Sequence, residues 1–234
     1  MNNSSLYKKY KDFKVLLVYP NIQMCEMMPY SMGLLTALLR REGFQVDLFD
    51  STFYVDKLNE QYISYHDYVQ EFDWKEKGRI FKSDIIKDFH KKIEEFDPDL
   101  ISVSVVENTY STGKKMIESL PEKMKKIPIL WGGVFATFAP QLIFRDNIGD
   151  YVCRGEGDNA VIDLCKRICE GKSTDNTPNL WVRKNGSLIK NKMGPLANLE
   201  EAPLPDYSLF EEHAIHRAMQ GKIRRTIGIE TQRG

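Results

Sequence analysis

The feature that most constrains the fold of this chain is an alternation of short apolar runs with longer amphipathic segments. Runs rich in Val, Ile and Leu, each the length of a strand, fall at residues 14–19, 45–49, 99–106, 127–131 and 151–153. Segments with apolar residues three and four apart, as in helices that cover a sheet, fall at residues 31–41, 111–125, 141–145 and 156–170. This order predicts an α/β domain with a five-stranded parallel sheet, doubly wound and flavodoxin-like (Rossmann-type).

Residues 1–172 are expected to form this domain, with one long interruption. Residues 50–98 separate the second and third expected strands, far more than the roughly 2–6 residues of an ordinary connection. A helical insertion is predicted at 52–81, because its apolar and aromatic residues step by four and three: Leu58, Tyr62, Tyr65, Val69 and Phe72. That face either packs on its own domain or acts as a lid or docking surface for another.

The chain after residue 172 changes character. Asn185-Gly186 lies between two alternating runs, which predicts a β-hairpin extension over 173–194. Residues 195–223 are expected to be a proline-stiffened linker followed by a helix at 208–220. Residues 225–231 have the composition of a strand, so 224–234 is expected to be the first strand of a further domain that this chain cuts short.

Charge and composition exclude several kinds of partner. Lys plus Arg and Asp plus Glu number 33 each, so no basic excess is available to bind nucleic acid or an anionic membrane. No apolar run has the length of a signal peptide or a membrane span. Four cysteines at irregular spacing do not make a disulfide framework. These observations predict a cytoplasmic protein whose partner is a small molecule or another protein domain.

In an open α/β sheet, ligands bind over the carboxyl ends of the strands. The residues at those ends are therefore the predicted site: Tyr19, Asn21, Ser104, Val105, Val106, Glu107, Gly132, Gly133, Phe135, Ala136, Thr137, Arg154, Gly155 and Glu156. The pair Gly132-Gly133 either clears side chains from the path of a bulky ligand or only makes a tight turn. Gly155-Glu156-Gly157 opens a helix, whose N–H groups attract polar ligands or are capped by Glu156 or Asp158.

Motifs for several common ligands are absent from the sequence. There is no G-x-G-x-x-G after the first strand, no phosphate-binding loop and no G-x-S-x-G nucleophile turn. Each of the four histidines fits a surface or half-buried residue better than a metal ligand, and Cys165 and Cys169 fit buried thiols better than a metal site. The chain has no C-x-x-x-C-x-x-C triplet, so it cannot by itself hold a radical-generating [4Fe-4S] cluster.

Taken in order, its segments resemble the N-terminal cobalamin (vitamin B12)-binding domain of radical S-adenosylmethionine (SAM) enzymes. The segments that carry the resemblance are KVLLVYPN at 14–21, QVDLFD at 45–50, DPDLISVS at 97–104, LWGGVFAT at 130–137 and DYVCRGEGDNAVIDL at 150–164. EEAPLPDYSLF at 200–210 resembles the family's connector, and ETQRG at 230–234 the strand end before the cluster cysteines. No single segment is specific, but their order and spacing are.

The resemblance implies a corrin ring over the strand ends and a nucleotide tail beside the sheet. Ser104 would meet the tail, Gly132-Gly133 would let it pass, and Tyr19, Asn21 and residues 135–137 would border the ring. Methionine synthase and the mutases carry D-x-H-x-x-G after the first strand, but the loop at 21–26 has no His. The resemblance therefore implies base-off cobalamin without a histidine ligand.

The resemblance places SAM and the [4Fe-4S] cluster in a downstream radical SAM domain that performs methyl transfer, radical rearrangement or ring formation. One alternative is a degenerate, cofactor-free domain that acts as a scaffold or substrate-recognition module. Another is an independent binder of a different nucleotide.

Overall fold

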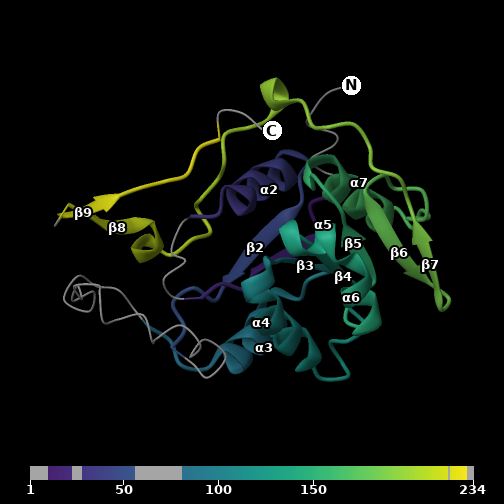
Figure 1. The fold of residues 1–234 in the computed structure, drawn as a ribbon, viewed down its shortest axis with the longest axis horizontal. Coiled ribbons are helices and arrows are strands. Elements are labelled where there is room, and N and C mark those ends of the chain that lie inside the picture. Colours follow the sequence, from purple (N-terminus) through teal and green to yellow (C-terminus); the bar gives the residue numbers. More distant parts are fainter. Residues whose placement is uncertain (1–9, 23–27, 56–80, 221, 231–234) are drawn as a thin grey trace.

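A computed structural model describes residues 10–22, 28–55, 81–220 and 222–230. Its centre is a seven-stranded sheet in the order β2-β1-β3-β4-β5-β6-β7 (Figure 1). The five parallel strands confirm the predicted topology: β1 Lys14–Tyr19, β2 Gln45–Asp50, β3 Leu100–Ser104, β4 Ile129–Gly132 and β5 Tyr151–Cys153. The predicted hairpin, β6 Leu180–Lys184 and β7 Ser187–Lys190, pairs antiparallel with β5 and so extends the same sheet.

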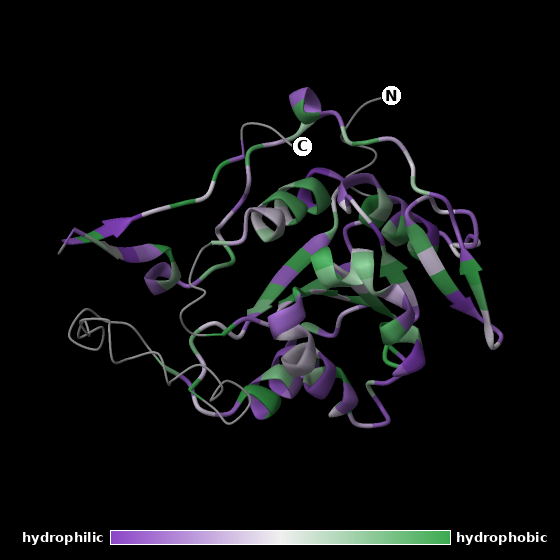
Figure 2. Cartoon of the chain, viewed as in Figure 1, coloured by the Kyte–Doolittle hydropathy of each residue, from purple (hydrophilic) through white to green (hydrophobic). Residues whose placement is uncertain are grey.

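Helices cover both faces of the sheet, each over its own hydrophobic core. On one face lie α2 Tyr30–Arg41 and α7 Asp158–Cys169. The other face carries α3 Ile85–Phe96, α4 Glu107–Glu118, α5 Val134–Phe138 and α6 Pro140–Arg145. The strands between the two layers are largely hydrophobic, whereas the helices carry hydrophilic as well as hydrophobic residues (Figure 2). This two-core arrangement is the doubly wound fold that the alternating sequence predicts.

Strand β3 shows how the pleat divides its residues between the cores. Ile101 and Val103 are fully buried on the α3 and α4 side, and Leu100 is buried on the α2 and α7 side. Since successive strand residues point to opposite faces, Ser102 and Ser104 share the face of Leu100. The side chains that β3 presents to α2 and α7 therefore become small toward its carboxyl end.

The chain after β7 differs from the prediction. The helix expected at 208–220 is wrong: η2 Leu199–Glu201 and η3 Glu212–Ile215 are 3₁₀ turns, and β8 His216–Met219 pairs antiparallel with β9 Lys222–Arg225. Gln220 adopts a left-handed φ of 52°, which turns the chain back between the two strands. The ribbon projects from the body of the molecule (Figure 1).

Two further expectations concern the last predicted strand and the predicted insertion helix. The strand expected at 225–231 is wrong within the described residues, because β9 ends at Arg225 and residues 226–230 are irregular. The predicted insertion helix falls largely at 56–80, outside the described residues.

No helix in the described ranges combines the length and the apolar character that crossing a membrane requires.

Candidate functional site

A cavity of about 500 Å³ opens at the carboxyl ends of β1, β3, β4 and β5. One wall is α2, through Tyr30, Met32 and Leu35, and the opposite wall is the start of α7, through Asp158 and Val161. Strand β1 pairs with β2 on one side and β3 on the other, so the cavity lies beside the point where the strand order reverses. Open α/β sheets bind their ligands at this position. Its volume is in the range of small-molecule sites.

The cavity exists because the strands at its floor carry small side chains. Ser102 pairs with Leu130 and Ser104 pairs with Gly132 in the β3–β4 register. On this face the last register row therefore holds one hydroxymethyl group and one hydrogen atom. Larger residues at these positions would fill the space between α2 and α7, as the buried Leu17 and Leu164 do deeper in the same core.

The two glycines at the end of β4 do different things. A Cβ added to Gly132 would have no neighbour within 4 Å, so this residue leaves space open in the cavity. A Cβ added to Gly133 would lie 2.5 Å from the Val105 carbonyl oxygen, and its φ of 90° is left-handed. Gly133 is therefore required by the turn itself, whereas Gly132 shapes the cavity.

Ser102 is a lining residue that the sequence prediction omitted. It is only 6% exposed and borders the cavity, and its hydroxyl has no hydrogen-bond partner among the described residues. A hydroxyl that borders the cavity and has no protein partner can donate to and accept from a ligand, so Ser102 is suited to bonding one. Strand alternation could have found it, since it lies two residues before the predicted Ser104.

The structure brings most of the predicted site residues to the cavity. Those that line it are Tyr19, Ser104, Val105, Val106, Gly132, Gly133, Thr137, Gly155 and Glu156. Thr137 ties two of the rim segments together: its hydroxyl donates to the Gly133 carbonyl and accepts from the Gly155 N–H, both at 3.0 Å. The rim between α5 and the loop after β5 is thereby fixed in place.

The other five predicted residues face elsewhere. Asn21 is buried against Ser51 and Thr52, and Glu107 is the first residue of α4. Phe135 stacks on Tyr110 with ring centroids 4.2 Å apart, and Ala136 is buried in the α3–α4 core. Their segment forms the short helix α5, which turns these two side chains away from the cavity. Arg154 lies over the Trp181 ring, 5.1 Å from its centroid.

The rim of the cavity is apolar on one side and acidic on another. Val106, Val134 and Phe138 line it with exposed side chains, 48%, 61% and 80% respectively. Its charged residues, among those described, are the carboxylates of Glu156, Asp158 and Glu230. The exposed apolar side suits a ligand with a large apolar face.

The cysteines near this face are mostly neutral thiols. Cys153 lies in the floor of the cavity, where burial raises the pKa of its thiol to about 12. Burial raises the pKa of Cys165 as well, but Cys169 is exposed, contrary to its interpretation as a buried thiol. The described residues contain no group of three or more potential metal-ligating side chains.

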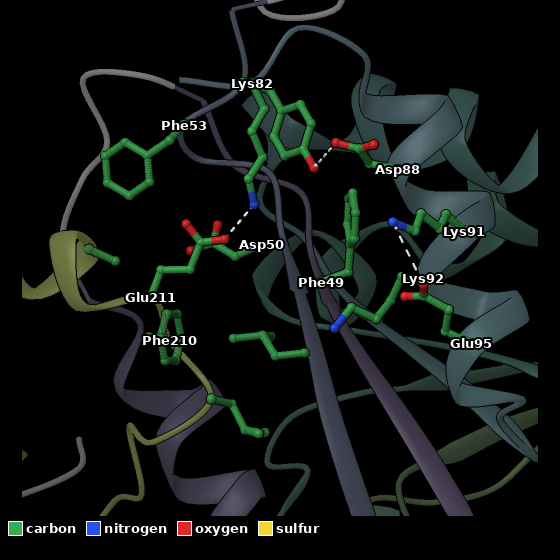
Figure 3. Close-up of a pocket in the computed structure, with 14 residues that line it drawn as sticks. Phe49, Asp50, Phe53, Lys82, Asp88, Lys91, Lys92, Glu95, Phe210 and Glu211 are labelled. Carbon is green, nitrogen blue, oxygen red and sulfur yellow. Dashed lines mark hydrogen bonds and ion pairs between the residues drawn. The ribbon is translucent and has the colours of Figure 1, made fainter. Parts of the chain in front are cut away.

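A second cavity, of about 320 Å³, lies along the edge strand β2 (Figure 3). Several of its polar side chains pair with one another: Lys82 with Glu211, Lys91 with Glu95 and the Tyr54 hydroxyl with Asp88. Burial raises the pKa of Asp50 in this cavity to about 6, against the hydrogen bonds that it accepts from Thr52. The Lys82–Glu211 pair connects residues 209–214 to the body of the domain.

Comparison with known proteins identifies the family of this domain. The B12 binding domain profile matches residues 26–164, more than half of the chain, and spans the cavity floor and both of its helical walls. The chain belongs to the B12-binding domain family. Gly132, the open floor and the partnerless Ser102 hydroxyl fit this assignment, since they provide a slot that can admit a long ligand.

Relatives of this B12-binding domain chain are cobalamin-dependent radical SAM enzymes. It is 24% identical over 201 residues to the tryptophan 2-C-methyltransferase of Streptomyces laurentii, covering 81% of this chain and 29% of that protein. The radical SAM methyltransferase TsrM from Kitasatospora setae, with cobalamin and a [4Fe-4S] cluster bound, matches at 23% identity over 91% of this chain and 31% of its own, with a TM-score of 0.55.

The cobalamin-dependent SAM radical enzyme OxsB, with aqua-cobalamin bound, matches at 20% identity, with a TM-score of 0.60 over 85% of this chain and 24% of its own. This chain thus spans less than a third of the length of each of these three relatives. The likeness to OxsB and to cobalamin-bound TsrM shows a shared fold.

Proposed function

We propose that this domain binds cobalamin and serves as the cofactor module of a cobalamin-dependent radical SAM enzyme. The observation that carries the proposal is the slot between α2 and α7, which small side chains on β3 and β4 keep open. The slot lies within the segment that matches the B12 binding domain, and the nucleotide tail of a corrinoid would enter it at the strand ends. When bound, the corrinoid supplies a cobalt centre able to carry a methyl group.

The residues of this chain have distinct parts in the proposal. Ser102 and Ser104 would hydrogen-bond the tail, and Gly132 would give it room. Tyr19 and the exposed apolar residues Val106 and Phe138 would border the ring, because a macrocycle with large apolar surface gains from covering them. Thr137 would hold the rim in position through its bonds to Gly133 and Gly155.

We also propose base-off binding without a protein histidine. None of the described cavity residues is a histidine. His90 lies on α3, across the sheet, with its ring nitrogen 2.9 Å from the Ser119 hydroxyl, and His213 and His216 belong to the connector region. This arrangement supports a lower cobalt face that would meet no histidine of the described residues.

The activity of the whole enzyme is inferred from the relatives. We propose a downstream radical SAM domain that holds SAM and a [4Fe-4S] cluster and performs methyl transfer, radical rearrangement or ring formation. Its location is proposed to be cytoplasmic. The match to a tryptophan methyltransferase and to two cobalamin-dependent radical enzymes supports this reading.

Titration of the purified chain with hydroxocobalamin tests the proposal. We expect corrinoid absorbance to co-elute with the protein on gel filtration and the visible spectrum to shift to the base-off form. Co-elution without the base-off shift would contradict the proposed ligation state only. No retention at all would favour the cofactor-free alternative.

A further inference from the structure

The part of the cavity between α2 and α7 is lined by buried apolar side chains. Met32 of α2, Leu130 of β4, Cys153 of β5 and Val161 of α7 border it, and each of them is at most 3% exposed. All four belong to the hydrophobic core on the α2 and α7 face of the sheet. A group that enters this space therefore contacts mainly hydrocarbon and a thiol.

Ser102 places one hydroxyl group among these apolar neighbours. In the parallel register it lies between Leu17 on β1 and Leu130 on β4, both of which are buried. Ser104 lies two residues further along β3, at the strand end, where its Oγ would be 3.1 Å from a Cβ added to Gly133. The hydroxyl of Ser102 can therefore donate one hydrogen bond to a ligand in a position that is flanked by leucines.

The nucleotide tails of corrinoids end in bases of different polarity. Dimethylbenzimidazole, the base of cobalamin, is an apolar bicycle whose one free ring nitrogen accepts a hydrogen bond when it leaves the cobalt. Adenine, the base of a second class of corrinoids, carries an amino group and further ring nitrogens that leucines and a thiol leave without good partners. Burying polar groups without partners costs free energy, whereas burying methyl groups gains it.

The carboxylates that border the cavity beside α7 have interactions within the protein. Glu156 accepts from the Ala197 N–H at 2.6 Å, and Asp158, the first residue of α7, also interacts with other parts of the chain. An adenine amino group would have to compete with these interactions to gain an acceptor there. The surroundings therefore favour a base that needs no such acceptor.

We propose that the space bordered by Met32, Leu130, Cys153 and Val161 receives the base of the nucleotide tail and selects corrinoids with an apolar base over those with a purine. The Ser102 hydroxyl would donate to the free ring nitrogen of dimethylbenzimidazole, and the apolar lining would cover its methyl groups. Adenine in the same place would bury its amino group against hydrocarbon. This inference rests on the proposed function and names the class of corrinoid that the domain takes.

Affinities of the whole chain for three corrinoids test the inference: hydroxocobalamin, its adenine analogue and its p-cresol analogue, all measured by titration calorimetry. We expect the adenine analogue to bind about ten- to hundredfold more weakly than hydroxocobalamin. The p-cresol analogue has an apolar base without a ring nitrogen, so it cannot ligate its own cobalt. We expect it to bind within about tenfold of hydroxocobalamin, because it loses only the bond to Ser102.

Two matched cysteine variants test whether the lining of the cavity causes the selectivity. Cys153→Ser adds a hydroxyl that can accept from the adenine amino group, so the preference for hydroxocobalamin over the adenine analogue should fall about three- to tenfold. Cys165→Ser makes the same replacement at a buried position of the same core that does not line the cavity, and it should keep the wild-type ratio. Since each ratio is taken within one protein, differences between the free corrinoids cancel when the ratios are compared.

The outcomes separate this inference from the proposed function. Equal affinities for hydroxocobalamin and the adenine analogue, or tighter binding of the adenine analogue, would overturn the selectivity while leaving cobalamin binding intact. A ratio that Cys153→Ser and Cys165→Ser change equally would overturn the role of the cavity lining. Failure of all three corrinoids to bind would overturn the proposed function as well. Circular dichroism melts establish that each variant is folded, and the comparison on the wild-type chain requires neither variant.

Discussion

Replacing Gly132 with leucine is expected to block cobalamin binding without unfolding the domain. Gly132 ends β4, and a Cβ there would meet no atom within 4 Å, so the new side chain extends into the cavity and not into the core. Its φ lies outside the left-handed region, so leucine fits the backbone. Strand positions favour residues other than glycine, and the free energy of unfolding is therefore expected to stay within about 1 kcal/mol of wild type or to rise.

The size of the affinity loss follows from the crowding of the complex. Forcing extra methylene groups into a filled space costs about 1–3 kcal/mol. At about 1.4 kcal/mol for each tenfold change, hydroxocobalamin should bind roughly 5- to 150-fold more weakly. Gly132→Ala, which adds one carbon at the same place, is expected to lie at or below the lower end of that range.

Isothermal titration calorimetry, paired with thermal melts, measures both effects. Gly133→Ala is the contrasting variant, because its Cβ would lie 2.5 Å from the Val105 carbonyl oxygen at a φ of 90°, and we expect it to lose about 1–3 kcal/mol of stability. Wild-type affinity in folded Gly132→Leu would refute the reasoning. So would a melt showing that Gly132→Leu is destabilised as much as Gly133→Ala.

Three other predictions concern the described residues. Ser102→Ala should keep the fold and weaken hydroxocobalamin binding about 3- to 10-fold, measured by titration; unchanged affinity would show that the hydroxyl makes no ligand bond. Because the pKa of Asp50 is raised to about 6 in the folded state, ionisation of Asp50 destabilises the fold as pH rises from about 4 to about 6. Relative to wild type, the free energy of unfolding of Asp50→Asn should therefore rise by about 1–3 kcal/mol over that window, as measured by urea melts. A stability difference that does not change with pH would contradict this. Iodoacetamide at pH 8 should modify Cys169 and spare Cys153 and Cys165 in peptide mass mapping, and fast labelling of either buried thiol would show that its site opens to solvent.

The parallel strands could be predicted from the sequence because their signal is local. Apolar β-branched runs of four to six residues, each followed by an amphipathic segment, specify strands buried on both faces whatever the distant residues are. The position of the cavity followed from the same logic, since parallel strands bring their carboxyl ends to one edge.

The connector could not be predicted this way. Residues 208–220 have helical spacing, but Ala214 and Ile215 are buried against Met28 and Phe53, and β8 gains a partner in β9. These contacts join segments far apart in sequence and override a weak local preference.

The orientation of individual site residues could not be predicted from the sequence either. The sequence places Gly132 and Gly133 side by side, yet only the backbone geometry shows that one opens the cavity and the other makes the turn. The family resemblance implies that Phe135 and Ala136 border the ring, but α5 turns them into the opposite core. A pattern locates the end of a strand more readily than it orients the side chains that follow.

The central claim is that the space over Ser102, Ser104 and Gly132 holds the nucleotide tail of a corrinoid. Comparing the affinities of cobalamin and of cobinamide, which has the same ring but no nucleotide tail, addresses that claim most directly. We predict that cobalamin binds at least about tenfold more tightly, a difference of about 1.4 kcal/mol. Equal affinities would contradict the account, because a tail that contributes nothing does not occupy this slot.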